Sequence, residues 1–210
     1  MRKSHVAQHP AQADLFATEP ALPEGLTYRP QFLTAAEEAE LLAVIGRLPL
    51  RAARYKAYEA RRRILSFGSS YDFADNRLKP APPVPEFLLP LRARVGRWLS
   101  IDAAAFEHAL ITEYLPGTPI GWHRDTPDFE VVVGISLGGR CRMRFRPYPH
   151  VPHSGRSTVE LELAPRSAYV IRGVARWRWQ HHIPPAEEHR YSITFRTLAA
   201  RHGERGPAKI

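Results

Sequence analysis

The sequence predicts a mainly β protein: a double-sheet β structure with helices packed on one outer face. Two observations lead to this prediction. Helical periodicity is confined to the N-terminal half, and from residue 109 onward short strand-like segments alternate with Gly, Pro and Asp turns. Seven strands that follow two helices are typical of such a fold. The chain has 210 residues, enough for one domain with a buried core, and its single cysteine, Cys141, excludes an intramolecular disulfide framework and a cysteine-based zinc site.

The N-terminal elements begin after a segment without periodicity. Residues 1–24 are rich in Ala, Pro and Gln, and we expect a flexible leader there. Residues 25–33 are typical of a first strand. Thr34 and Glu37 form a capping-box pattern, which predicts a helix that begins at this point and extends to Leu48.

The next fifty residues contain one more helix. Residues 50–73 are basic and aromatic, with little regularity at their start. Residues 76–85 include four prolines and predict a loop. Residues 85–99 repeat apolar side chains at helical spacing and predict the second helix.

Short strands occupy the remainder of the chain. Each predicted strand is a run of β-branched and aromatic residues bounded by turn residues. The seven segments are 110–115, 130–137, 142–145, 159–163, 168–171, 177–183 and 190–198. We find neither a repeat nor a second domain, so residues 25–199 are expected to form one domain and residues 200–210 a polar tail.

The charge of the chain bears on its partners. The formal net charge is +9, which favours a polyanionic partner such as nucleic acid, although a solvated basic surface explains it nearly as well. No apolar run reaches 18 residues, and no signal peptide is recognisable. We therefore expect a cytoplasmic monomer that does not interact with a membrane.

A possible metal site begins with His123 and Asp125. Two residues apart on an extended backbone, they share one face and can bind the same ion. The pattern alone arises often by chance, so a third ligand is needed. His181 is the candidate, on a segment where residues 179, 181 and 183 share a face; the alternative is an exposed histidine pair. His182 lies on the opposite face, where we expect solvent exposure.

Residues 190–196 suggest an anionic ligand. Strand alternation places Arg190, Ser192, Thr194 and Arg196 on one face and the apolar residues between them on the other. Buried arginines need anionic partners, and a bound dicarboxylate would provide them through paired hydrogen bonds. The alternative is an edge strand whose arginines reach solvent.

These motifs together carry a resemblance to a known family. Taken in order, residues 114–117, His123-x-Asp125, His181-x-Ile183 and residues 190–196 resemble the AlkB family of Fe(II)/2-oxoglutarate-dependent dioxygenases, over about residues 25–199. The resemblance implies a double-stranded β-helix (jelly-roll, cupin-like) core with flanking helices. It also implies Fe(II) as cofactor, with 2-oxoglutarate and O2 as co-substrates.

The resemblance also assigns roles to individual residues. It implies that His123, Asp125 and His181 are the catalytic iron ligands. Arg190 matches the position that pairs with the distal carboxylate of 2-oxoglutarate, and Arg196 the position near its C1 carboxylate. Supporting hydrogen bonds are assigned to Thr112, Tyr114 and Ser192. Thr112 and Ser192 both stand where many members carry Asn. Residues 126–130 are closer to the RNA- and tRNA-acting branches of the family than to its founding DNA-repair enzyme.

A substrate-binding lid is expected over about residues 50–75, where this family has its nucleotide-recognition segment. Residues 61–71 are basic and aromatic, suited to phosphates and to stacking on an exposed base. We expect Arg62, Phe67 and Tyr71 to contact the substrate. The alternative is a solvated loop with Phe67 and Tyr71 buried as anchors.

A second basic feature lies near residue 143. Four arginines at positions 140, 142, 144 and 146 alternate with apolar residues, so one face of this strand is basic. That face could bind a phosphate backbone, and a merely soluble strand face explains it almost as well.

The expected function is oxidative dealkylation of alkylated bases in DNA or RNA, single-stranded or with the target base flipped out. One alternative keeps the iron chemistry but places a protein side chain or a small molecule in the site. A catalytically idle nucleic-acid-binding module conflicts with the intact ligand set. A metal-dependent hydrolase leaves Arg190 and Arg196 unexplained.

Overall fold

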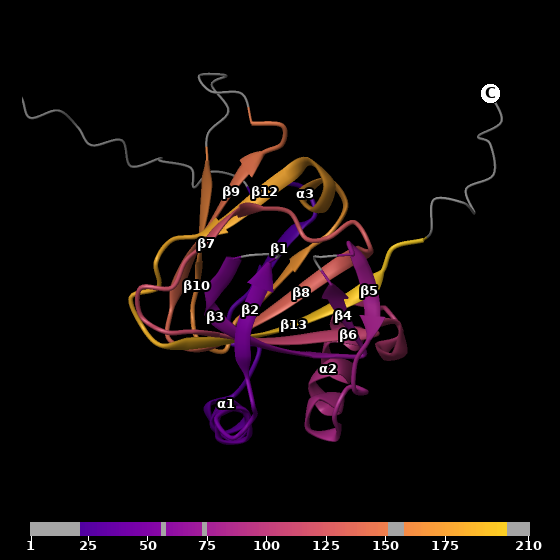
Figure 1. Ribbon diagram of the computed structural model, residues 1–210, viewed down its shortest axis with the longest axis vertical. Coiled ribbons are helices and arrows are strands. Elements are labelled where there is room, and N and C mark those ends of the chain that lie inside the picture. The colour runs from indigo at the N-terminus through magenta and orange to yellow at the C-terminus, as the bar shows by residue number, and fades with distance from the viewer. Residues whose placement is uncertain (1–21, 56–57, 73–74, 151–157, 201–210) are drawn as a thin grey trace, which may run out of the picture.

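The chain folds into two antiparallel β-sheets with helices against one of them (Figure 1). The computed structural model describes residues 22–55, 58–72, 75–150 and 158–200. Most of the expected leader and the tail from residue 201 onward lie outside these ranges. In the part described, no helix is long and apolar enough to cross a membrane.

The larger sheet has seven strands in the order β1-β11-β8-β13-β6-β3-β2. In chain order these strands are β1 (Leu26–Arg29), β2 (Arg51–Tyr55), β3 (Tyr58–Phe67), β6 (His108–Tyr114), β8 (Phe129–Gly138), β11 (Ala168–Ile171) and β13 (Arg190–Leu198). The smaller sheet has the order β10-β9-β12-β7. Its strands are β7 (Ile120–His123), β9 (Cys141–Pro147), β10 (Val159–Leu163) and β12 (Trp179–Ile183). The predicted double-stranded β-helix, or jelly roll, is confirmed.

Two helices cover the outer face of the larger sheet, as the sequence predicts. They are α1 (Ala35–Ile45) and α2 (Leu89–Leu99), and Figure 1 shows both on the side away from the smaller sheet. The capping box is present, since the Thr34 hydroxyl accepts from the Glu37 amide while the Glu37 carboxylate accepts from Thr34. Two 3-10 turns, η1 (Glu86–Leu88) and η2 (Ala103–Ala105), flank α2.

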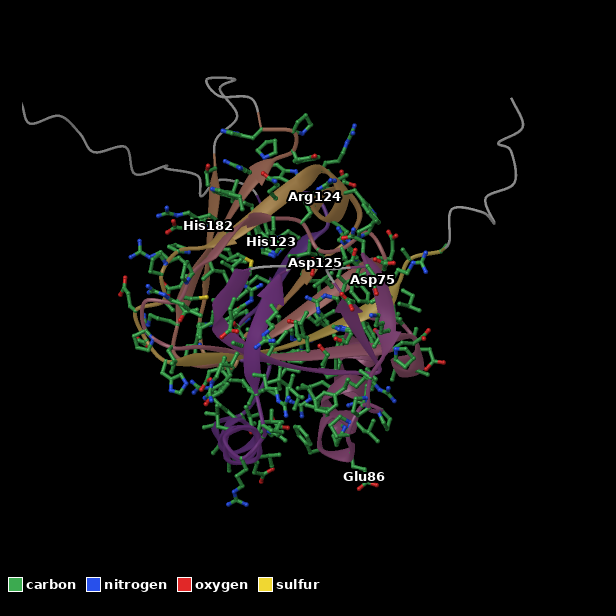
Figure 2. All side chains as sticks on the ribbon, in the orientation of Figure 1. Asp75, Glu86, His123, Arg124, Asp125 and His182 are labelled. Carbon is green, nitrogen blue, oxygen red and sulfur yellow. The ribbon has the colours of Figure 1, made fainter. Side chains whose placement is uncertain are left out.

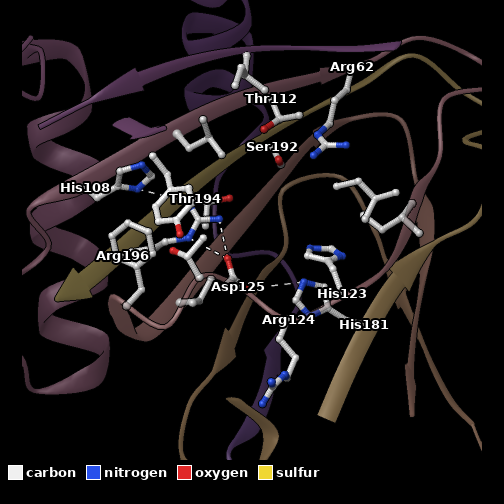
Figure 3. A pocket seen from close by; sticks show the side chains of 18 of the residues that line it. Arg62, His108, Thr112, His123, Arg124, Asp125, His181, Ser192, Thr194 and Arg196 are labelled. Carbon is white, nitrogen blue, oxygen red and sulfur yellow. Dashed lines mark hydrogen bonds and ion pairs between the residues drawn. The ribbon is translucent and has the colours of Figure 1, made fainter. Parts of the chain in front are cut away.

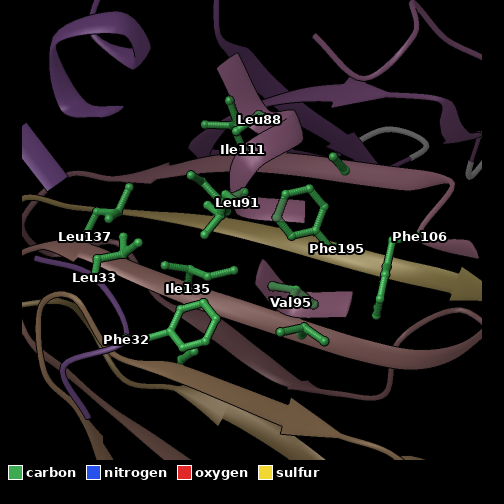
Figure 4. Packing of buried hydrophobic residues seen from close by; sticks show 14 of the residues in the cluster. Phe32, Leu33, Leu88, Leu91, Val95, Phe106, Ile111, Ile135, Leu137 and Phe195 are labelled. Carbon is green, nitrogen blue, oxygen red and sulfur yellow. The ribbon is translucent and has the colours of Figure 1, made fainter. Parts of the chain in front are cut away.

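Two apolar clusters hold these layers together. The first lies between the helices and the larger sheet, where Leu88 and Val95 pack with Ile135 and Phe195 (Figure 4). The second lies between the two sheets and includes Phe145 of the smaller sheet. Alternate residues of β8 and β13 therefore serve opposite faces of the larger sheet. This leaves one face of β13 for the interior of the roll.

Three parts of the chain differ from expectation. Residues 77–80 form a strand, β5 (Arg77–Pro80), paired with β4 (Ser69–Asp72), and not the predicted loop. Proline is compatible with the end of such a two-stranded edge. Residues 50–67 supply two regular strands, with β3 paired to both β2 and β6. A short helix, α3 (Gly173–Arg178), replaces the start of the strand predicted from residue 177, because six residues are too few to show a helical period.

Ile135 tests the first cluster. It is fully buried on β8 beneath the helices, so Ile135→Ala should lower the free energy of unfolding by about 2–5 kcal/mol through lost contacts and a residual cavity. Val44→Ala, on the exposed side of α1, should change it by less than about 0.5 kcal/mol. Urea unfolding followed by circular dichroism measures both. Equal losses would contradict this placement of the core.

Candidate metal and co-substrate site

Strand β13 delivers polar side chains into the roll. It pairs with β6 on one side and β8 on the other, so it is a central strand and its arginines are not at an edge. Ser192, Thr194 and Arg196 line a cavity of 520 Å³, while Ile193 and Phe195 pack into the core under the helices. The predicted alternation is therefore present.

The three candidate metal ligands meet at this cavity (Figure 3). The rings of His123 and His181 have centroids 4.2 Å apart, and Asp125 Oδ2 lies 3.7 Å from Nε2 of His181. His123 and His181 are directly paired in the register of β7 and β12. Nδ1 of His123 lies 2.8 Å from the carbonyl oxygen of Gly121; because a carbonyl can only accept, this nitrogen carries the proton and Nε2 is free to bind a metal.

Asp125 already has a cationic partner. Nε and Nη2 of Arg196 donate to its Oδ1 at 2.9 and 2.8 Å. The chain after β7 brings Asp125 to Arg196, so one of the two arginines has an anionic partner from within the chain. Among the residues the structure describes, no three His, Cys, Asp or Glu side chains are yet arranged as a formed metal site. The candidate ligands are thus gathered at one place, with Asp125 held by Arg196.

Burial and nearby charges set the protonation of these groups. Burial lowers the pKa of His181 to about 3, helped by the neighbouring His123, and burial also lowers the pKa of His123. Burial alone would raise the pKa of Asp125, but the combined charges around it, that of Arg196 first among them, outweigh burial and hold this pKa well below its usual range. Neutral imidazoles and a charged carboxylate are the forms that bind a metal ion.

Arg190 is the largest fully buried side chain and lacks a full set of partners. Its Nη2 donates to the Ser136 hydroxyl at 3.3 Å, and its guanidinium lies 4.6 Å from the ring centre of Tyr114. Nε and Nη1 have no hydrogen-bond partner among the described residues. An unpaired buried guanidinium is unfavourable by several kcal/mol, so this position fits a carboxylate supplied from outside the chain.

Three further predicted residues surround this position. In the register of β6 and β13, Tyr114 faces Arg190 and Thr112 faces Ser192. Tyr114, Thr112 and Ser192 all line the cavity. The chain therefore presents hydroxyl groups next to the unsatisfied guanidinium, which is a suitable environment for a carboxylate ligand.

The predicted substrate residues divide between two faces of the structure. Arg62 and Tyr71 line the cavity. Phe67 does not: it is buried in the cluster under the helices. Its distance from Arg62 is five residues, an odd number, so strand alternation sends the two side chains to opposite faces of β3. Phe67 is a core residue here, as the alternative interpretation of this segment allowed.

Gly68 explains how Tyr71 reaches the cavity. It has φ +76°, and a Cβ there would lie 1.8 Å from the backbone oxygen of Glu107. Only glycine adopts this backbone and tolerates this approach without strain. Phe67 and Tyr71 are four residues apart and would face the same side of one unbroken strand. The bend at Gly68 separates β3 from β4, so Tyr71 faces the cavity although Phe67 lies in the core.

The sequence interpretation missed His108. It is buried and lines the cavity, and its Nδ1 lies 3.3 Å from Nη1 of Arg196. Burial, with the charge of Arg196, lowers the pKa of His108 to about 3, so the ring is neutral and can accept this hydrogen bond. His108 lies four residues before Thr112 on the same strand. Because this spacing is even, the two side chains face the same side of β6, and that was the signal available in the sequence.

The basic strand near residue 143 is mostly neutralised. Arg142 and Arg144 pair with Glu160 of the adjacent strand. Arg140 pairs with Glu162 and Glu188. The interpretation of all four arginines as one phosphate-binding face is not supported, because acidic residues distant in sequence lie against three of them.

Comparison with known proteins identifies the family. A family model described as the 2OG-Fe(II) oxygenase superfamily matches residues 25–196. The chain belongs to this superfamily. It is a dioxygenase whose cofactor is Fe(II) and whose co-substrates are 2-oxoglutarate and O2. The buried, unsatisfied Arg190 and the nitrogen and oxygen donors of the candidate triad fit those groups.

Relatives place this oxygenase among AlkB-like proteins. It is 30% identical over 181 residues to the alkylated DNA repair protein ALKBH8 homolog of Arabidopsis thaliana, covering 76% of this chain and 51% of that protein. It is 27% identical over 172 residues to the tRNA (carboxymethyluridine(34)-5-O)-methyltransferase ALKBH8 of Mus musculus, covering 79% of this chain and 25% of that one. The chain thus spans about half of the first relative and a quarter of the second. The AlkB-like resemblance is confirmed.

Solved structures share the fold. The structure of OsALKBH1 superposes with a TM-score of 0.64 at 14% identity, covering 84% of this chain and 98% of that one. A Pseudomonas putida prolyl-4-hydroxylase superposes with a TM-score of 0.58 at 18% identity, covering 83% and 93%. At these identities the likeness concerns the fold.

Phe67 and Tyr71 can be separated by experiment. Phe67→Leu should lower the free energy of unfolding by about 1 kcal/mol, because a flat ring is replaced in a packed core. Tyr71→Leu, half-buried in the small β4–β5 sheet, should change it by less than about 0.5 kcal/mol. Thermal melting checks both. A stability loss at Tyr71 larger than that at Phe67 would reverse these assignments.

Proposed function

We propose that this oxygenase oxidatively dealkylates alkylated nucleobases in DNA or RNA. The observation that carries the proposal is one cavity lined both by the candidate iron ligands and by Arg62 and Tyr71. Its volume of 520 Å³ lies within the range of about 300–1,000 Å³ typical of small-ligand pockets. The Arabidopsis relative, named an alkylated DNA repair protein homolog, supports the same substrate class.

In this proposal His123, Asp125 and His181 hold the iron. Gly121 fixes the tautomer of His123, and Arg196 orients Asp125 so that Oδ2 faces His181. Two histidines and one carboxylate leave coordination positions open, as the non-haem Fe(II) oxygenase pattern requires.

Arg190 is proposed to bind the distal carboxylate of 2-oxoglutarate through its unsatisfied Nε and Nη1. Arg196 is proposed to lie near the C1 carboxylate, with Thr112, Tyr114 and Ser192 donating or accepting supporting hydrogen bonds. His108 keeps the guanidinium of Arg196 in place by accepting from Nη1. These contacts fix the co-substrate without any general base from the protein.

The bound iron, with 2-oxoglutarate and O2, supplies oxidation of the alkyl carbon, which leaves as an aldehyde while 2-oxoglutarate becomes succinate and CO2. The chain positions the base for this chemistry. Tyr71 offers a ring on which a base can stack, and Arg62 offers donors for base or phosphate oxygens. A duplex substrate has to extrude its target base to reach the cavity.

Arg190→Met tests the co-substrate site without an activity assay. Thermal melting is followed in the presence of Mn(II) as 2-oxoglutarate is added. Wild type should be stabilised by about 2.7 kcal/mol at a hundredfold excess over the dissociation constant. Arg190→Met should lose this stabilisation while the unliganded protein melts no lower than wild type, because an unsatisfied buried charge is removed.

The matched control for that experiment is Arg172→Met, at an exposed arginine next to α3. It should keep the full response to 2-oxoglutarate. A full response in Arg190→Met would remove this residue from the co-substrate site.

Aldehyde release tests the substrate class. Wild type, supplied with Fe(II) and 2-oxoglutarate, should release formaldehyde from base-methylated single-stranded DNA or RNA oligonucleotides, and His123→Ala should release none. Arg62→Gln should lower kcat/KM by about tenfold or more, since a charged hydrogen bond contributes about 1.5–3 kcal/mol.

Arg61→Gln is the matched control, because Arg61 is exposed on the opposite face of β3, and its kcat/KM should stay within about twofold of wild type. If no oligonucleotide yields aldehyde while a protein or small molecule drives succinate formation, the substrate belongs to the alternative class.

A further inference from the structure

The four arginines of the basic strand β9 differ in their interaction partners. Arg140, Arg142 and Arg144 all pair with glutamates. Arg146 instead donates from Nε to the side-chain oxygen of Gln180 at 3.0 Å, and among the described residues no carboxylate lies within ion-pair distance of it. One arginine of the four therefore keeps its charge without an internal counterion.

Arg146 also lies over an aromatic ring. Its guanidinium carbon lies 4.3 Å from the ring centre of Trp122, and that ring lies 5.0 Å from the ring of His182. Trp122 lines the cavity and directly precedes His123. Arg146 itself does not line the cavity: it lies on the outer face of β9, opposite Met143, which does, and Trp122 connects it to the cavity wall.

A second stack of the same kind follows His123. The guanidinium carbon of Arg124 lies 3.8 Å from the ring centre of Tyr148, and its Nη1 donates to the carbonyl of Trp177 at 3.1 Å. In the part of the chain that the structure describes, no carboxylate pairs with Arg124 either. Tyr148 is 41% exposed and Arg124 lines the cavity, so this charge lies at the mouth. Figure 2 labels Arg124 and His182 close to His123.

Such stacks suit the recognition of phosphates. A guanidinium lying on an aromatic face keeps the N–H groups at its edge available, and the ring limits the motion that would be lost on binding. Phosphate oxygens accept two N–H groups at once, and contacts to phosphates make up a large share of nucleic-acid interfaces. Arg124 lines the cavity and Arg146 lies over Trp122, which also lines it, so a strand that leaves the cavity over Trp122 can bring its phosphates to both arginines.

We propose that Arg124 binds a phosphate next to the nucleotide inserted into the cavity and that Arg146 binds a phosphate further along, so that a single strand of nucleic acid leaves the cavity over the outer face of the smaller sheet. This inference rests on the proposed function and adds a path for the bound strand. Because the contacts are to phosphates, the path does not depend on the base sequence.

The salt dependence of binding tests this path. Fluorescence anisotropy of a labelled, unmodified single-stranded oligonucleotide, without iron or 2-oxoglutarate, is measured over a range of NaCl concentrations. Each arginine that contacts a phosphate contributes about 0.7 to the slope of log affinity against log salt for a single strand. Arg146→Gln and Arg124→Gln should each reduce the magnitude of this negative slope by about 0.7, and the double variant should reduce it by about 1.4.

Two variants serve as controls. Arg144→Gln changes the same face of the same strand at a residue already paired with Glu160, and its slope should equal that of wild type. Arg146→Lys keeps the charge without the planar stack, so it should restore most of the slope lost in Arg146→Gln. Thermal melting of every variant should stay close to wild type.

The outcomes separate the two proposals. If wild type binds with a strong salt dependence and Arg146→Gln behaves as Arg144→Gln does, the strand path is wrong and the proposed function is unaffected. If wild type binds no oligonucleotide, both proposals fall. If polyglutamate binds wild type as tightly and loses affinity equally in the variants, the surface is a site for acidic protein and not for nucleic acid.

Discussion

The rest of the site depends on the burial of two arginine charges on β13. Because this strand hydrogen-bonds to β6 and β8 on its two sides, its register is fixed, and a shift of one residue would exchange its polar and apolar faces. The packing of Ile193 and Phe195 under the helices therefore forces Arg190 and Arg196 into the roll. The interior must then compensate those charges. Asp125 compensates Arg196, and Arg190 retains two unsatisfied nitrogens.

Alternation within a strand was the part of the site that the sequence could predict. It placed the polar face of β13 correctly, and it placed His123 and His181 on strands whose register does pair them. Phe67 was misassigned because residues 61–71 were interpreted by composition alone. Strand alternation would have placed Phe67, five residues after Arg62, on the opposite face of β3. The same alternation on β6 would have added His108 to Thr112 and Tyr114. The strand at residues 77–80 was missed for another reason: the four prolines of residues 76–85 indicated a loop, and the pairing with β4 is visible only in the tertiary structure.

Ion pairs between distant residues were beyond the reach of the sequence. Positions 140 to 146 present four arginines at the same spacing, and nothing local distinguishes them. Only the antiparallel register of β9 with β10 brings Glu160 and Glu162 alongside the first three, and only β12 brings Gln180 to Arg146. The functional difference between these arginines is thus a property of neighbouring strands. In the same way, no local pattern indicates that Asp125 and Arg196, 71 residues apart, share a hydrogen bond.

The charge of the cavity wall favours an anionic ligand. Asp125 is the one carboxylate among the described residues that line the cavity, whereas Arg62, Arg124 and Arg196 also line it and Arg190 lies behind Tyr114. In the proposed site, a divalent cation held by Asp125 would add positive charge to an interior that already has an excess of it, which is unfavourable at low dielectric constant. A dicarboxylate bound at Arg190 would offset that excess. In this proposal metal and co-substrate would therefore stabilise each other through charge, in addition to any bond between them.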